Sequence, residues 1–158
     1  MEWINSLRGK IVGLDTAPLI YFIEEHPDYL EHLRPFFKAV DQGELKIVTS
    51  LITLLEVLVH PFRSGNTQLA QQYRDILLHS ENLLLVPLSQ ELAEKAAQLR
   101  AQYNLRTPDA IQIATALHQG ASVFVTNDTR LPLISELQVL VVEPLIQAQS
   151  GSQGSIKK

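Results

Sequence analysis

The segment Lys10-Ile11-Val12-Gly13-Leu14-Asp15-Thr16 decides the fold of this chain. A short apolar run that ends abruptly at polar residues is typical of a strand buried on both faces of a sheet. The residues that follow, from Pro18 to Glu25, have the composition of a helix. The segment therefore predicts a buried strand and a helix, with the carboxylate of Asp15 at the turn between them.

The same arrangement of a short apolar segment followed by a helix recurs along the chain. Strands are predicted at residues 10–14, 44–49, 83–88, 121–125 and 139–142, and helices at residues 18–25, 28–40, 50–60, 68–79, from 89 onward, and from 107 to just before Gly120. Parallel strands need helical crossovers and are covered on both faces. We therefore expect an α/β sandwich around a mostly parallel sheet.

Helix ends are predicted from individual residues. Ser50 is expected as the N-cap of the helix over residues 50–60, and Pro61 is expected to end that helix. Thr107 is expected as the next N-cap, with Pro108 at the first helical position and Gly120 just beyond the end. These signals predict where the loops between strands and helices lie.

The composition indicates one domain. Its negative net charge argues against binding nucleic acid through overall charge alone. The chain has 158 residues, 46% of them hydrophobic, no cysteine and a formal net charge of −4. We expect one domain over residues 1–146, a disordered polar tail over residues 147–158, and no disulfide or thiolate chemistry. No apolar run approaches the roughly 18 residues that a membrane span needs, and the N-terminus lacks a signal-peptide pattern, so a cytoplasmic protein is expected.

This pattern places three acidic residues where ligands bind in parallel sheets, beyond the carboxyl ends of the strands, and places a fourth, Asp109, less directly. Asp15 ends the first strand, Asp128 follows the fourth, Glu56 lies in the helix after the second strand, and Asp109 begins the helix before the fourth. Clustered carboxylates repel unless a cation is present, and oxygen-only ligands favour Mg²⁺ or Mn²⁺. The chemistry indicated is metal-assisted attack of water on a phosphodiester.

Each acid also has a structural explanation. Asp15 and Asp128 fit turn or cap positions, and Asp109 fits the first turn of a helix, where the helix dipole favours a carboxylate. Glu56 lies in a helix that is apolar nearly all round, so we expect it to be buried and in need of a partner. Its alternative role is a capping box with Thr53.

Other chemistries have little support. The five histidines show no zinc-binding spacing, and the chain has no nucleophile elbow, phosphate-binding loop or dinucleotide-binding motif. A phosphatase with Asp15 as nucleophile stays an alternative. Ala17, however, stands where a haloacid-dehalogenase-type enzyme would carry its second acid.

Four motifs in order make the chain resemble the PIN-domain nucleases, most closely the toxin subunits of VapBC-type toxin–antitoxin pairs. The resemblance covers residues 9–145. Its motifs are Leu14-Asp15-Thr16-Ala17-Pro18-Leu19-Ile20, Leu54-Leu55-Glu56-Val57, Thr107-Pro108-Asp109-Ala110-Ile111-Gln112-Ile113-Ala114-Thr115-Ala116 and Thr126-Asn127-Asp128. In two places the chain departs from the family pattern: Ala17 replaces a frequent Asn, and Leu131 replaces a frequent Asp or His, which leaves the acidic set at four.

The resemblance implies a PIN-like three-layer α/β/α sandwich with a five-stranded parallel sheet of order 3-2-1-4-5. It also implies an Mg²⁺- or Mn²⁺-dependent endoribonuclease, a homodimer and a small antitoxin partner. Asp15, Glu56, Asp109 and Asp128 would be the metal-binding and catalytic residues, supported by hydrogen bonds from Thr16 and Thr126.

Contacts with RNA are expected first from Arg106 and Arg130, which stand beside two of the acids in the sequence, and then from Arg63 and Arg74. Arginine suits bidentate recognition of phosphate. The alternative function is a PIN-like module that no longer cuts and acts by binding a partner.

Overall fold

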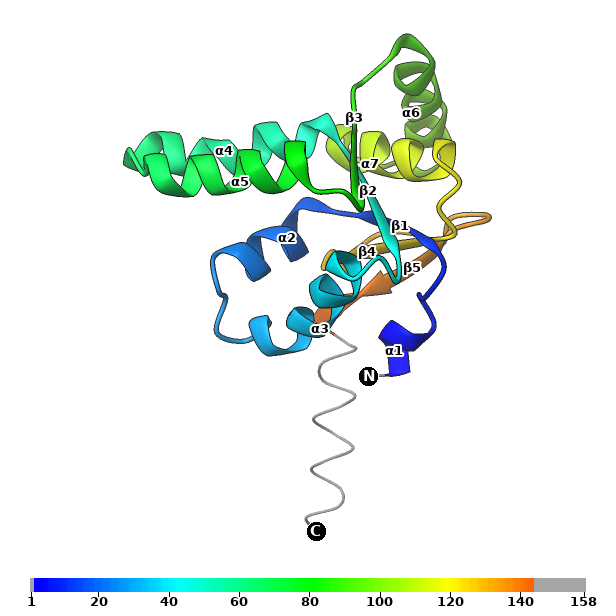
Figure 1. Ribbon diagram of the computed structural model, residues 1–158. Helices are drawn as coiled ribbons and strands as arrows, with labels where there is room; N and C mark the ends of the chain where they lie inside the picture. Colours follow the sequence, from blue (N-terminus) through cyan, green and yellow to red (C-terminus); the bar gives the residue numbers. More distant parts are fainter. Residues whose placement is uncertain (1, 144–158) are drawn as a thin grey trace.

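A five-stranded parallel sheet forms the centre of the structure, a computed structural model that describes residues 2–143 (Figure 1). The strand order is β3-β2-β1-β4-β5, and every pair of neighbours is parallel. The strands are β1 (Ile11–Leu14), β2 (Lys46–Ser50), β3 (Leu83–Val86), β4 (Val123–Thr126) and β5 (Gln138–Val141). The predicted sandwich fold, the five strands and their order are confirmed.

Helices cover both faces of the sheet, as the continuous apolar strands require. The helices are α1 (Glu2–Asn5), α2 (Thr16–Ile23), α3 (Leu30–Asp41), α4 (Leu51–Ser64), α5 (Thr67–His79), α6 (Gln90–Tyr103) and α7 (Thr107–His118). Val12 and Leu14 of β1 belong to an apolar cluster that includes residues of α1, α2, α3 and α5. A second cluster, on the opposite face, joins Val48 of β2 and Phe124 of β4 to α6 and α7.

Gly13 of β1 allows α7 to pack directly on the sheet. A Cβ atom at this position would lie 2.7 Å from the Cβ of Ala116 and 2.9 Å from a ring carbon of Phe124, distances that real Cβ atoms do not tolerate. Because α7 can approach β1 this closely, its first turn is brought beside the carboxyl end of β1. The glycine of the opening segment thus helps to set the position of Asp109 relative to Asp15.

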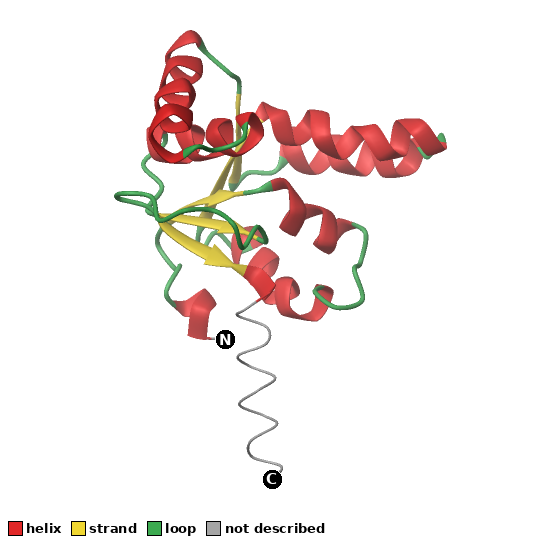
Figure 2. Ribbon diagram, turned by 180° about the vertical axis from the view of Figure 1, so that it is seen from behind, coloured by secondary structure: helices red, strands yellow, loops and turns green. Residues whose placement is uncertain are grey.

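Helices α4 and α5 form a hairpin that projects away from the sheet (Figures 1 and 2). Ser50 caps α4 as predicted, since its side chain accepts a hydrogen bond from Ile52 N at 3.2 Å. The prediction that Pro61 ends the helix is wrong. The proline is buried, and the helix continues to Ser64, beyond which Gly65 adopts a left-handed conformation with φ of 67°.

The expectation that the helix carrying Glu56 is buried on most sides is also wrong. Only Thr53, Val57 and Pro61 of α4 are buried, whereas Leu55 is 64% exposed. The reason is that α4 extends past the sheet and packs mainly on α5, so most of its surface has no neighbour in the described chain. Glu56 is therefore exposed, and Thr53 lies inside the helix rather than at its cap.

Other helix boundaries differ from the predictions by a residue or two. Helix α2 begins at Thr16 because Asp15 serves as its N-cap. The N-cap of α7 is Arg106, and Thr107 is already helical, so the predicted threonine cap is wrong. Pro108 lies in the first turn of the helix, and Asp109 in the same turn accepts a hydrogen bond from Arg106. Gly120 follows the end of α7 with φ of 80°, as expected.

Two further expectations concern the ends of the chain and the membrane. The polar tail over residues 147–158 lies outside the described residues, and so does the end of the domain expected at residue 146. Within residues 2–143, no helix combines the length and the apolar character that crossing a membrane requires.

Candidate active site

The structure brings the four predicted acids together in one pocket of about 370 Å³. Asp15 follows β1 and Asp128 follows β4, and α4, which carries Glu56, begins directly after β2. Asp109 lies in the first turn of α7, the helix that leads into β4, so this turn is at the same edge of the sheet. The pocket is also lined by Thr16, Ala17, Ile20, Arg106, Pro108 and Arg130.

Asp15 is held by the turn that it caps and by the end of a neighbouring strand. Its Oδ1 accepts a hydrogen bond from Thr16 N at 2.9 Å, and its Oδ2 accepts one from Thr126 Oγ1 at 2.7 Å. Burial raises the pKa of Asp15, and the charges of Asp109 and Asp128 raise it further, against these two hydrogen bonds. Asp15 is thus both a helix cap and a carboxylate that is costly to ionise.

Glu56 faces Asp15 across the first turn of α2. Its Oε1 accepts a hydrogen bond from Thr16 Oγ1 at 2.9 Å, so the residue after Asp15 in the chain also holds Glu56. Loss of solvent raises the pKa of Glu56, and so do the charges of Asp15 and Asp109, while Thr16 and Arg106 act in the other direction. Loss of solvent is the main cause of both raised pKa values, and the charges of neighbouring acids add to it.

The guanidinium group of Arg106 bridges Asp109 and Asp128. Arg106 Nε donates to Asp109 Oδ2 at 3.1 Å, and Arg106 Nη2 lies 3.8 Å from Asp128 Oδ2. Arg130 donates to Asp128 Oδ1 through its backbone N at 2.9 Å and through Nε at 3.2 Å. Burial raises the pKa of Asp128, but the bonds and charges of the two arginines outweigh it, and the pKa is lowered.

The donor set fits a hard divalent cation in its chemistry, since it consists of four carboxylates with no histidine or thiolate. Among residues 2–143, however, no three acids or histidines are already arranged to hold a metal ion. Arg106 occupies the space between Asp109 and Asp128, whereas each oxygen of Asp15 accepts one hydrogen bond and keeps a second lone pair. A metal ion on Asp109 would compete with this guanidinium group.

Behind the acids lies a buried polar network that the sequence reasoning missed. Thr49 of β2, Thr53 of α4 and Gln112 of α7 are each at most 2% exposed and bond to one another. The available signal was a glutamine inside an otherwise apolar stretch of α7, three residues after Asp109. Thr53 had been considered only as a capping residue.

The two weaker arginine candidates lie away from the acids. Arg63 is in the last turn of α4, and the guanidinium carbon of Arg74 lies 5.6 Å from the ring centre of Phe62, near the end of the hairpin. Neither residue lines the carboxylate pocket.

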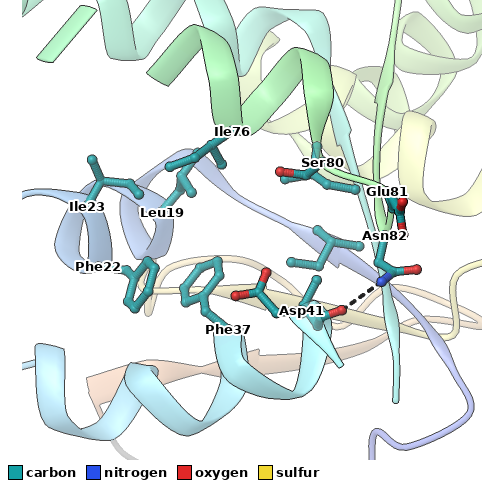
Figure 3. Close-up of a pocket in the computed structure, with 12 residues that line it drawn as sticks. Leu19, Phe22, Ile23, Phe37, Asp41, Ile76, Ser80, Glu81 and Asn82 are labelled. Carbon is teal, nitrogen blue, oxygen red and sulfur yellow. Dashed lines mark hydrogen bonds between the residues drawn. The ribbon is translucent and has the colours of Figure 1, made fainter. Parts of the chain in front are cut away.

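A second pocket, of about 350 Å³, lies between α2, α3 and α5 and has a different character (Figure 3). Its walls are apolar, with Leu19 and Phe22 from α2, Phe37 from α3 and Ile76 from α5. The polar residues Asp41, Ser80, Glu81 and Asn82 lie to one side of it, and Asn82 Nδ2 donates to Val40 O at 2.9 Å. None of the four predicted acids lines this pocket.

Comparisons with solved structures find the same fold in toxin–antitoxin proteins. VapBC2 from Rickettsia felis, solved with a DNA fragment from its promoter, is 23% identical with a TM-score of 0.62, over 83% of this chain and 98% of that one. A toxin–antitoxin complex from Klebsiella pneumoniae is 25% identical with a TM-score of 0.57, over 82% and 95%. VapC20 from Mycobacterium tuberculosis, a toxin that cleaves the sarcin-ricin loop, is 16% identical with a TM-score of 0.60, over 72% and 86%.

A comparison with curated proteins gave no match. Among known families, the PIN domain matches residues 12–137, a range that contains all four acids, strands β2, β3 and β4, and all of β1 except Ile11; β5 begins one residue beyond it. The order of the strands and the position of the acids at their carboxyl ends agree with the resemblance seen in the sequence. The chain belongs to the PIN domain family.

Proposed function

We propose that this PIN-domain protein is a nuclease, specifically an Mg²⁺- or Mn²⁺-dependent endoribonuclease that hydrolyses RNA phosphodiester bonds. The observation that carries the proposal is the pocket in which Asp15, Glu56, Asp109 and Asp128 meet. These acids come from four segments far apart in the sequence, and their charges act on one another. A fold that accepts such repulsion gains nothing from it in stability, which favours a functional reason for the cluster.

In this proposal, Asp15, Glu56 and Asp109 hold the metal, and Asp128 is a further ligand or positions the attacking water. A bound divalent cation would activate that water and offset the charge that develops on the phosphate. Thr126 orients Asp15 through the hydrogen bond to Oδ2, and Thr16 orients Glu56 through Oε1. Both threonines thus fix the direction in which a carboxylate presents its free lone pairs.

Arg106 and Arg130 are the proposed contacts with the RNA backbone. Both line the pocket, and their side chains are 66% and 76% exposed, so they can reach a ligand at its mouth. They provide the local positive charge that an acidic protein needs in order to bring a phosphate close to four carboxylates.

We further propose that the protein is the toxin of a type II toxin–antitoxin pair, acts in the cytoplasm, forms a homodimer and binds a small antitoxin protein. Support for a partner comes from the relatives of known structure, of which VapBC2 and the Klebsiella protein are toxin–antitoxin complexes. The chain also exposes large apolar side chains along α4, among them Leu55 and Phe62, which are available to another protein.

A second candidate function is a PIN-like module that binds a partner without cutting. The observation that favours it is the absence, among the described residues, of three ligands already arranged for a metal, with Arg106 placed between two of the acids. Calorimetric titration with Mn²⁺ separates the two functions, since the nuclease binds the ion and the silent module does not.

The experiment that tests the proposed function compares cleavage of RNA by the full chain and by the variants Asp15→Asn and Asp109→Asn. Both variants are expected to fold and to lose Mn²⁺-dependent cleavage, because each removes a charge that the metal requires. Asp41→Asn is the matched control: it removes an exposed carboxylate beside the apolar pocket and is expected to leave cleavage unchanged. Unaltered cleavage by both site variants would refute the proposal.

A further inference from the structure

We infer that Gln112 is a positioning residue, which sets the spacing of Asp15, Glu56 and Asp109 through a directed chain of buried hydrogen bonds. The inference rests on the proposed function for its catalytic meaning. Its structural basis is independent, because it concerns the contacts that join β1, β2, α4 and α7 behind the acids.

The orientation of the Gln112 amide is fixed by its surroundings. Its Oε1 accepts a hydrogen bond from Ser50 N at 3.1 Å, and its Nε2 donates to Thr53 Oγ1 at 2.7 Å. A rotated amide would place its NH₂ group against the N–H of Ser50, two donors facing each other. Gln112 therefore acts as an acceptor toward the start of α4 and as a donor toward Thr53.

This orientation determines the direction of the next bonds. Thr49 Oγ1 lies 2.8 Å from Leu14 O and 3.3 Å from Gln112 Oε1, two oxygens that can only accept, so its single proton points to the nearer Leu14 O and not to Thr53. The contact of 2.7 Å between Thr49 and Thr53 then requires Thr53 as the donor. The series of hydrogen bonds thus runs from Gln112 to Thr53, to Thr49 and to the carbonyl of Leu14, the residue before Asp15.

Three segments of this hydrogen-bonded series lead to an acid of the pocket: α7 carries Asp109, α4 carries Glu56, and β1 ends directly before Asp15. Gln112 stands three residues after Asp109 on α7, and Thr53 stands three residues before Glu56 on α4, so each pair shares one helix face. Thr16, which donates to Glu56 at 2.9 Å, lies 3.3 Å from Thr53. Three of the four acids are thus fixed relative to one another by a network that none of them belongs to.

The network is closed to bulk solvent, so a group that loses its partner has no bulk water beside it. Thr53 is fully buried and Gln112 is 2% exposed, and no buried side-chain nitrogen or oxygen in the described chain lacks a partner. A side chain without the amide would fill the same space on α7 but would leave Ser50 N without its acceptor and would remove the bond that Thr53 Oγ1 accepts from Gln112. The expected consequence is a shift of the first turn of α4 relative to α7, which changes the distance between Glu56 and Asp109.

The test uses Gln112→Met and the pair Thr53→Val and Thr53→Ser in the full chain. Methionine keeps the length of glutamine without its amide, valine keeps the shape of threonine without its hydroxyl, and serine keeps the hydroxyl. We expect Gln112→Met and Thr53→Val to weaken Mn²⁺ binding in calorimetry by roughly 10- to 100-fold, the range typical of residues that orient metal ligands. We expect kcat for RNA to fall with KM retained, and Thr53→Ser to restore both properties.

Thr115→Val is the matched control for the loss of a buried hydroxyl. Thr115 lies on the same helix and donates only to Ile111 O at 2.7 Å, outside the network. If Thr115→Val loses thermal stability but binds Mn²⁺ as the wild type does, the loss of a buried hydroxyl does not by itself lower the metal affinity. Wild-type Mn²⁺ binding in Thr53→Val, or a loss of Mn²⁺ binding in Thr115→Val or Thr53→Ser as large as that in Thr53→Val, would overturn the inference.

Crystal structures of the metal-free wild type and Thr53→Val give a readout that needs neither metal nor activity. The Thr16–Glu56 hydrogen bond is expected in the wild type and in Thr53→Ser, and is expected to be lost in Thr53→Val. If the wild type neither binds Mn²⁺ nor cuts RNA while Glu56 moves in the variant, the proposed function fails and the positioning role stands. If Glu56 stays in place, the positioning role fails even when the wild type is active.

Discussion

Helix α2 lies between two pockets of similar volume that differ in polarity and charge. On one side, Thr16 and Ile20 line the carboxylate pocket, and on the other, Leu19 and Phe22 line the apolar pocket of Figure 3. In the first pocket, burial and, to a smaller extent, the charges of Asp109 and Asp128 raise the pKa of Asp15, whereas in the second, apolar side chains pack around a fully buried Leu19. One face of the eight-residue helix α2 thus contributes to stability, and the other face lines the candidate active site.

The two faces of α2 have opposite effects on the free energy of unfolding. Apolar contacts behind α2 stabilise the native state by removing surface from water. The carboxyl groups of Asp15 and Glu56 oppose folding when they are ionised without a cation, because loss of solvent and nearby like charges favour their neutral forms, whereas the arginines lower the pKa of Asp128. Substitutions on the two faces should therefore change stability in opposite directions.

The largest effect on stability is expected from Leu19→Ala on the apolar face. Removing a fully buried leucine side chain costs about 2–5 kcal/mol of unfolding free energy, depending on how far the surroundings close around the space. Cleavage per folded molecule should stay unchanged, since Leu19 does not line the carboxylate pocket. Denaturant unfolding and RNA cleavage at low temperature measure the two properties.

Leu133→Ala is the control for this substitution, because Leu133 is 95% exposed and should change stability by less than about 0.5 kcal/mol. Equal effects of the two leucine variants would show that the apolar face of α2 does not stabilise the fold.

A smaller effect of opposite sign is expected from Asp15→Asn on the polar face. In metal-free buffer, the variant should be more stable than the wild type at neutral pH by about 0.5–2 kcal/mol, the common range for stabilising substitutions. Asparagine keeps a hydrogen-bonding partner for Thr16 N and for Thr126 but carries no charge. Thermal unfolding with a chelator present measures the difference.

The sign of the pH dependence follows from the raised pKa of Asp15. Between the ordinary pKa of an unfolded aspartate and the higher native value, the folded protein holds a proton that the unfolded chain releases. The wild type therefore loses unfolding free energy relative to Asp15→Asn as pH rises through that window, and the gap stays constant above it. A gap that shrinks with rising pH, or that Asp41→Asn reproduces, would contradict this explanation.

The smallest effect is expected from Arg130→Gln at the rim of the carboxylate pocket. Its side chain is 76% exposed, so the variant should fold normally and bind single-stranded RNA a few-fold more weakly in the presence of a chelator. Loss of one phosphate contact should also reduce the salt dependence of binding, by about 0.7 in the slope of log affinity against log salt. Arg34→Gln, which removes an exposed arginine paired with Glu31, should change neither property.

Much of the fold could be predicted from the sequence because it depends on local patterns. Apolar runs and turn residues gave the five strands, and the caps at Ser50 and Gly120 were correct. The errors at Pro61 and Thr107 arose where the surroundings outweighed a local preference. The burial of α4 was wrong for a similar reason, since an apolar composition does not reveal whether a helix packs on the sheet or projects from it.

The sequence by itself determined the parallel α/β sheet and singled out Asp15 and Glu56, because strand periodicity and the carboxyl-end rule act along the chain, whereas Asp109 and Asp128 depended largely on the resemblance to family motifs. Only the tertiary structure decided how the acids are held: Thr126 on Asp15, Arg106 between Asp109 and Asp128, and the buried network behind them. Those contacts join residues far apart in the sequence, or depend on the direction of a side chain. The position of Gln112 against Thr53 is of this kind, since it exists only once α7 has packed on Gly13.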